Sequence, residues 1–229
     1  MTPLSLDDRE DVALHQILDG NIPQFLRRFV PIHTRMTDSA GHTVRATYWV
    51  MPDYLSVGGN RDFARLPLTP MTAQQIADSL RCFLPTRKMV DDIYRQARVR
   101  PEPVPIYIYR DSALMFLNHH YIIEGQRQNR KGLIAGIKKD VVLSGKISRA
   151  GKTDRVAIYG WHRTNGQPIQ PLYTGHVNRY VDYSHGIRLV YRKVRVNSRW
   201  MDYRDVLQHP VYRALLCDEE WCDFFRYGE

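Results

Sequence analysis

No stretch of the chain is apolar over the length that a transmembrane helix requires. Such a helix needs about 20 consecutive apolar residues. The N-terminal Met-Thr-Pro-Leu-Ser-Leu-Asp-Asp-Arg-Glu also lacks the basic region and apolar core of a signal peptide. The sequence therefore predicts no membrane span, and it fits either a cytoplasmic protein or an exported protein whose leader has been trimmed.

Cysteine is scarce, with three residues in 229: Cys82, Cys217 and Cys222. An odd number implies no complete disulfide framework. Cys217 and Cys222 are near enough in sequence to pair, but three cysteines are equally compatible with a reducing compartment. Internal repeats and low-complexity segments are also absent from the sequence, so we expect neither a repeat architecture nor a disordered region.

Positive charge, by contrast, is plentiful: 33 lysines and arginines face 24 aspartates and glutamates, which gives a net charge of +9. This favours anionic partners such as nucleic acid, acidic polysaccharide, cell wall or membrane headgroups. The charge is spread along the chain, whereas nucleic-acid binders more often concentrate it in a stripe. With 43% hydrophobic and 25% charged residues, residues 1–229 are expected to form one globular domain with a sizeable core.

Helices dominate the prediction for the N-terminal part, residues 1–130. Apolar side chains recur there at helical spacing, and Thr86 and Asp111 stand where caps are expected. β-branched and aromatic residues predict strands at 43–51 and 103–109 and a hairpin of 55–57 with 63–66. The helices are expected over residues 7–19, 23–29, 72–82, 86–97 and 112–128.

From Gly132 the pattern changes to short strands that Gly and Asn turns separate. This strand-rich part, residues 131–200, precedes a C-terminal helix at 202–216. A regular alternation of strands and helices is missing, so the sequence predicts an α+β fold with a largely antiparallel sheet. The strands are expected over residues 133–137, 140–143, 156–161, 169–172, 180–183 and 187–196.

The segment 159–188 is the strongest candidate for a functional site, because three of the nine histidines lie within it. Around His185, alternation along a strand places polar groups on both faces, which is costly to bury unless the strand end borders a cleft. His185 or His162 would act as a general acid or base, since imidazole titrates near neutral pH. The predicted catalytic residues are His162, His176, Ser184, His185 and Asp140, and the predicted substrate-binding residues are Arg188, Tyr159, Trp161, Tyr183 and Asp182.

Two other interpretations of the same histidines stay open. His162, His176 and His185 could together bind Zn²⁺ with water in the fourth position, although spacings of 14 and 9 residues match no standard metal motif. We therefore do not favour zinc and assign no cofactor. Alternatively, the imidazoles are bonded to the backbone or solvated at strand ends and have only a structural role.

The residues Ser184-His185-Gly186-Ile187-Arg188-Leu189 resemble the Ser-His-Gly-Cys-Ile-Arg-Leu motif of L,D-transpeptidases, which cross-link peptidoglycan. That family's nucleophilic cysteine is missing here between Gly186 and Ile187, and its upstream His-Gly appears in reversed order as Gly175-His176. The resemblance covers six residues and implies a cell-wall ligand without cysteine chemistry.

Residues 72–100 allow a different function, since they can form a helix-turn-helix that places a second helix in the major groove of DNA. Arg87, Lys88, Arg95 and Arg98 suit that role, whereas Asp91 and Asp92 would meet phosphates. An ordinary helical hairpin is the simpler interpretation. Cys82, at the end of the helix predicted over 72–82, is expected to be a buried packing residue and not a nucleophile.

The sequence leads us to expect a hydrolase or transferase that acts on an anionic or glycan-containing polymer, with peptidoglycan the first candidate. Such an enzyme requires the three histidines to converge in one pocket. A DNA-binding protein instead requires helix 86–97 to be exposed with its basic side chains together. A non-catalytic glycan-binding domain would show a flat aromatic surface, for example around Trp161, without convergent titratable groups.

Overall fold

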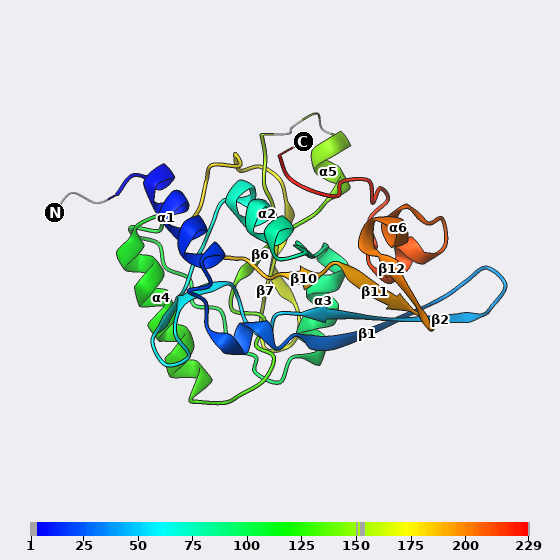
Figure 1. The fold of residues 1–229 in the computed structure, drawn as a ribbon, viewed down its shortest axis with the longest axis horizontal. Coiled ribbons are helices and arrows are strands. Elements are labelled where there is room, and N and C mark those ends of the chain that lie inside the picture. Colours follow the sequence, from blue (N-terminus) through cyan, green and yellow to red (C-terminus); the bar gives the residue numbers. More distant parts are fainter. Residues whose placement is uncertain (1–3, 150, 152–153, 229) are drawn as a thin grey trace.

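The computed structural model describes residues 4–149, 151 and 154–228, and it shows the predicted α+β fold, with helices mostly in the N-terminal half and strands mostly in the C-terminal half (Figure 1). The helices are α1 (Leu6–Leu18), α2 (Pro70–Ser79), α3 (Arg87–Gln96), α4 (Ala113–Arg127), α5 (Gly145–Arg149) and α6 (Tyr203–Gln208), with 3₁₀ turns η1 (Gln24–Arg27) and η2 (Tyr212–Leu215).

Each of the four longer helices begins at a hydroxyl side chain. Ser5, Thr69, Thr86 and Ser112 each accept a hydrogen bond from the backbone N–H three residues later. These caps satisfy donors that have no partner within the first helical turn. Local sequence therefore defines where the helices start, although α4 is capped by Ser112 and not by Asp111 as predicted.

A six-stranded sheet combines strands from both halves of the chain. The order is β12-β11-β2-β10-β5, and β1 pairs with β2 along its full length. The paired strands are all antiparallel. The bounds are β1 (Val30–Thr37), β2 (Thr43–Val50), β5 (Cys82–Phe83), β10 (Val190–Tyr191), β11 (Lys193–Val196) and β12 (Arg199–Asp202), and a separate small hairpin joins β3 (Ser56–Gly58) to β4 (Phe63–Arg65).

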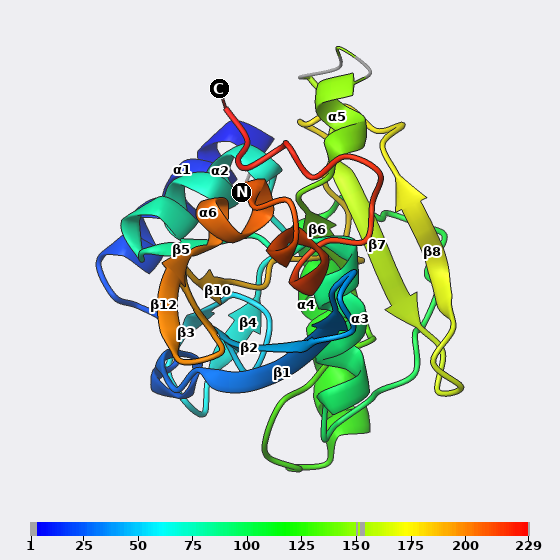
Figure 2. The same cartoon turned by 90° about the vertical axis from the view of Figure 1, so that its right-hand side faces the viewer.

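A second sheet has the order β8-β7-β6-β9. Its strands are β6 (Lys139–Val142), β7 (Ala157–His162), β8 (Pro168–Tyr173) and β9 (His185–Gly186), and β9 is parallel to β6. Helix α3 packs against β7 of this sheet and against β1 of the first sheet. Figure 2 shows α3 between the two sheets, a position that places each of its flanks beside a different strand.

Several predicted elements are wrong or displaced. The strand predicted over 187–196 divides into β10 and β11. Residues 103–109 form no strand, because Pro101, Pro103 and Pro105 remove alternate N–H donors along one edge. Residues 133–137 contribute one isolated bridge at Ile134. Residues 180–182 have no regular structure, and the chain turns at Tyr183 and Ser184, where the Asp182 carboxylate accepts the Ser184 N–H. The predicted helix 202–216 divides into α6 and η2 around Pro210, which cannot continue a helix.

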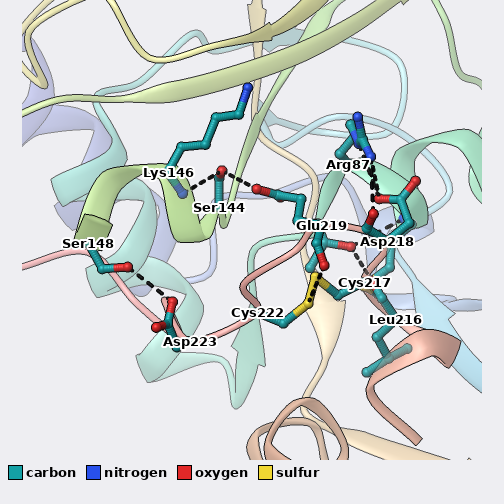
Figure 3. Close-up of a disulfide and its surroundings, with 12 residues drawn as sticks. Arg87, Ser144, Lys146, Ser148, Leu216, Cys217, Asp218, Glu219, Cys222 and Asp223 are labelled. Carbon is teal, nitrogen blue, oxygen red and sulfur yellow. Dashed lines mark hydrogen bonds and ion pairs between the residues drawn. A yellow bond between two sulfur atoms is a disulfide. The ribbon is translucent and has the colours of Figure 1, made fainter. Parts of the chain in front are cut away.

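The C-terminal segment is closed by a disulfide between Cys217 and Cys222 (Figure 3). Between these cysteines, the Glu219 carboxylate accepts a hydrogen bond from Ser144 Oγ at 2.6 Å. The neighbouring Asp218 carboxylate accepts a hydrogen bond from Arg87 at 3.1 Å. The closed loop thus connects the end of β6 to the first turn of α3.

We expect replacement of both cysteines, Cys217→Ser with Cys222→Ser, to lower the free energy of unfolding by about 2 kcal/mol, because a short loop then regains its freedom in the unfolded chain. Urea unfolding followed by tryptophan fluorescence measures the change. Reduction of the wild-type protein with dithiothreitol should give the same loss, and an unchanged midpoint in both experiments would contradict a stabilising role for the disulfide.

Candidate functional site

The three predicted histidines lie in two separate places. The rings of His176 and His185 are 6.5 Å apart, centre to centre. His162 instead pairs with Asp91 of α3, with 2.8 Å between Nε2 and Oδ1. The expected convergence of all three in one pocket is therefore not found, and each place has to be considered by itself.

The His162–Asp91 pair is held from several sides. The Tyr159 hydroxyl donates to the same carboxylate, at 3.0 Å from Oδ1 and 3.1 Å from Oδ2. The Tyr94 ring stacks on the imidazole at 4.4 Å with 13° between the planes, and its hydroxyl donates to the Arg163 carbonyl at 2.7 Å. These contacts fix the orientation of the imidazole, which is a requirement for precise proton transfer.

The backbone of β7 is irregular just before His162, whose side chain points toward α3. The register of β7 against β8 shifts between Ile158 and Gly160, as in a β-bulge. Gly160 has φ +108° and Trp161 has φ 57°, so two consecutive residues occupy the left-handed region. Such a conformation is uncommon for a residue other than glycine and is often found at functional sites.

His162 and Asp91 line a cleft of about 450 Å³ between α3 and the β7–β8 hairpin. Arg95 and Arg100 also line it, and the Arg100 guanidinium lies 5.1 Å from the centre of the Tyr94 ring. The His162 side chain is 2% exposed, whereas that of Asp91 is 25% exposed. The cleft therefore combines an oriented imidazole, a carboxylate and two cations, a set that suits proton transfer on an anionic molecule.

The His176–His185 pair belongs to a second cluster, in which Asp182 is the central anion. Its carboxylate accepts from Arg110 at 2.6 Å, from Tyr180 at 3.0 Å and from Ser184 Oγ at 2.5 Å. Burial would raise the pKa of Asp182, but His185, Ser184 and Arg110 hold it well below its ordinary value. Ser184 is fully buried, and its hydroxyl is committed to a carboxylate that stays ionised.

The imidazoles of this cluster are neutral at physiological pH. Burial lowers the pKa of His185 to about 4 and also lowers the pKa of His176. Burial lowers the pKa of Lys139 as well, and its Nζ lies 4.8 Å from the centre of the Trp161 ring. Perturbed titratable groups gathered in one place are a recognised sign of a functional site, although none of these histidines lines the cleft around Asp91.

Three further predicted residues lie in the interior. Arg188 is 1% exposed and donates to the carbonyls of Met51 at 2.8 Å and Ile134 at 2.6 Å. Asp140 lies 3.8 Å from Arg188 Nε, and burial raises its pKa to about 6. Tyr183 accepts the Ile106 N–H at its hydroxyl, at 2.5 Å. These contacts connect segments of the core, and neither Arg188 nor Asp140 reaches the cleft at His162.

The helix-turn-helix interpretation of 72–100 does not fit the structure. Strand β5 lies between the two helices and pairs with β10, so α2 and α3 form no simple hairpin. Met89 and Ile93 of α3 are buried, as are Asp92 and Tyr94 on its other sides. The intervening Cys82 is buried too, and burial raises the pKa of its thiol to about 12, as expected for a packing residue.

Among the described residues, no three His, Cys, Asp or Glu side chains are arranged to hold a metal ion. No helix in residues 4–149, 151 and 154–228 has the length and apolar character needed to cross a membrane.

The sequence prediction missed most of the residues that line the cleft, among them Asp91, Tyr94, Arg95 and Arg100. In the sequence Asp91 indicates only an obstacle to DNA binding, because nothing local distinguishes it from Asp92. On a helix, adjacent residues diverge by about 100°, so Asp91 faces His162 whereas Asp92 pairs with Lys88 at 2.7 Å. Comparison of the chain with known protein families, curated proteins and solved structures found no match.

Proposed function

We propose that the protein is a hydrolase or transferase that acts on an anionic or glycan-containing polymer, with peptidoglycan the first candidate, and that its histidine-centred site is the cleft at His162. The observation that carries this proposal is the 2.8 Å contact between His162 and Asp91 at the wall of a cleft that Arg95 and Arg100 also line. Oriented imidazoles of this kind serve as general acids and bases.

In the proposed reaction each group has its own role. Asp91 takes the hydrogen bond of a proton on His162 Nε2, so that the lone pair of the imidazole lies at Nδ1. That nitrogen takes a proton from an attacking water or hydroxyl, and Asp91 stabilises the imidazolium that forms. Tyr159 holds the Asp91 carboxylate in place, while Arg95 and Arg100 bind an anionic group of the polymer.

The cluster of His176, His185 and Asp182 is the second candidate centre, favoured by its lowered histidine pKa values. His176 is half-buried, whereas His185, like His162, is buried. In this alternative His176 exchanges the proton, and Lys139 and Arg110 bind the anionic group. Tests on His162 and His176 in parallel distinguish the two.

We expect His162→Gln and Asp91→Asn each to lower turnover by roughly 10²- to 10⁴-fold, the usual contribution of a general acid or base. Purified protein is incubated with peptidoglycan sacculi and with polygalacturonate, and released fragments are quantified by mass spectrometry. His15→Gln, at an exposed histidine of α1, serves as the matched control and should retain wild-type turnover.

One result would contradict this placement of the site, and another would contradict the proposed activity. Wild-type turnover by His162→Gln together with its loss in His176→Gln would transfer the site to the second cluster. Failure of the wild-type protein to release fragments from either polymer would argue against the proposed activity.

A further inference from the structure

The outer face of the six-stranded sheet carries a continuous basic surface. Cross-strand partners share a face, and Arg35 of β1 lies directly opposite Arg45 of β2. Strand β11 pairs with the other edge of β2, and there Arg195 is the cross-strand partner of Thr47. Arg195 is also the cross-strand partner of Trp200 in β12. Arg35, Arg45 and Arg195 are all exposed.

These arginines line a groove of about 840 Å³ on the side of α3 next to the cleft at His162. Its charged residues are five cations and one anion, namely Arg35, Arg45, Lys88, Arg95, Arg195 and Asp92. Asp92 is paired with Lys88 and Arg95. Within the described part of the chain, the side chains of Arg35, Arg45 and Arg195 form no ion pair.

The direct opposition of Arg35 and Arg45 is unfavourable by itself. Like charges directly across an antiparallel pair destabilise the sheet. A bound anion between the two guanidinium groups would remove this repulsion, since each can donate two parallel hydrogen bonds to a carboxylate or phosphate. The groove therefore has an arrangement that an anionic ligand stabilises.

An aromatic surface adjoins these cations. The rings of Trp49 and Trp200 stack at 4.9 Å with 29° between the planes, and the Arg195 guanidinium lies 5.9 Å from the Trp49 ring. Trp200 is 57% exposed. Because Trp200 covers Trp49, the surface offers one aromatic ring face to a ligand. Proteins that bind single-stranded nucleic acids instead stack successive bases on several aromatic side chains.

We propose that this groove binds a linear anionic glycan, with arginines on its carboxylate or phosphate groups and Trp200 against a sugar ring. Arg95 lines both the groove and the cleft at His162, so a chain bound in the groove leads toward that cleft. This inference rests on the proposed function in one respect only, namely that the glycan bound in the groove is the substrate of the cleft at His162.

The test is fluorescence anisotropy with four labelled probes of equal length: an oligogalacturonate, its neutral methyl ester, a phosphorylated mannan oligosaccharide and an oligothymidylate. We expect at least one anionic glycan to bind tenfold more tightly than both the methyl ester and the oligothymidylate. The affinity should fall with salt, since charged contacts are screened. Preference for the uronate or for the phosphorylated mannan identifies which anionic group the arginines select.

Variants then place the binding on the sheet. Arg45→Gln with Arg195→Gln should weaken glycan binding by tenfold or more, and Trp200→Ala by about fivefold. The matched control, Arg61→Gln with Arg213→Gln, removes the same charge from two exposed positions outside the groove and should bind like the wild type.

Three outcomes would overturn the inference: no binding of either anionic glycan, equal or tighter binding of the oligothymidylate, or equal losses in the groove and control variants. His162→Gln should bind the glycan normally. Glycan binding without turnover would refute the proposed activity and leave a binding domain, whereas turnover without groove binding would refute only this inference.

Discussion

Replacement of Arg65 by methionine is expected to lower the free energy of unfolding by about 3–5 kcal/mol, because it leaves buried carboxylate charge without its main partner. The Arg65 side chain is 1% exposed and bonds to Asp53 at 2.6 and 2.8 Å and to Glu124 at 2.7 Å. Burial would raise the pKa of Asp53, but Arg65 overrides this and holds it below its ordinary value. Without the guanidinium, the penalty of burying Asp53 remains.

Thermal and urea unfolding measure this loss, and for a chain of this size it corresponds to a fall in melting temperature of roughly 6–20 °C. The double variant Arg65→Met with Asp53→Leu should recover much of the stability, since it replaces the buried ion pair by an apolar pair. A single variant as stable as the wild type, or a double variant no better than the single, would contradict this interpretation of the network.

Acidification from pH 7 to pH 5 is expected to lower the free energy of unfolding by about 2 kcal/mol through the protonation of His119 alone. His119 is fully buried in α4, edge-on to the Tyr183 ring at 4.9 Å. Burial, with a smaller contribution from the charge of Lys138, lowers its pKa to about 2. Below the ordinary histidine pKa of about 6.5, the unfolded chain therefore binds a proton at His119, whereas the folded chain does not. The free energy of unfolding consequently falls progressively as the pH drops below about 6.5.

The measurement is the free energy of unfolding in urea at pH 7, 6 and 5 for the wild type and for His119→Leu, which cannot take up that proton. The difference between the two proteins should change by about 2 kcal/mol across the range in favour of the variant at low pH. Because the comparison uses the change with pH, a constant packing cost of leucine does not affect it. Parallel curves would show that His119 does not carry the acid sensitivity.

Much of the local structure follows from the sequence alone. The hydroxyl cap at Thr86, with apolar residues spaced to match, gives the position of α3, and β-branched and aromatic residues predict β2. These features depend on residues within a few positions of one another, so they are readable from a single chain. The α+β class follows from the same signals, and His162 stands out as a candidate because imidazole has a pKa close to neutral pH.

The pairings that make the sites were decided only in three dimensions. His162 meets Asp91 from 71 residues away, and Arg195 lies beside β2 although about 150 positions separate them in the chain. The two-residue strands β5 and β9 have no local pattern, because their hydrogen bonds come from distant strands. The sequence determined which residues could transfer protons or bind anions. Tertiary packing determined that His162 pairs with Asp91 and that the scattered arginines share one groove, because both depend on contacts between residues far apart in the chain.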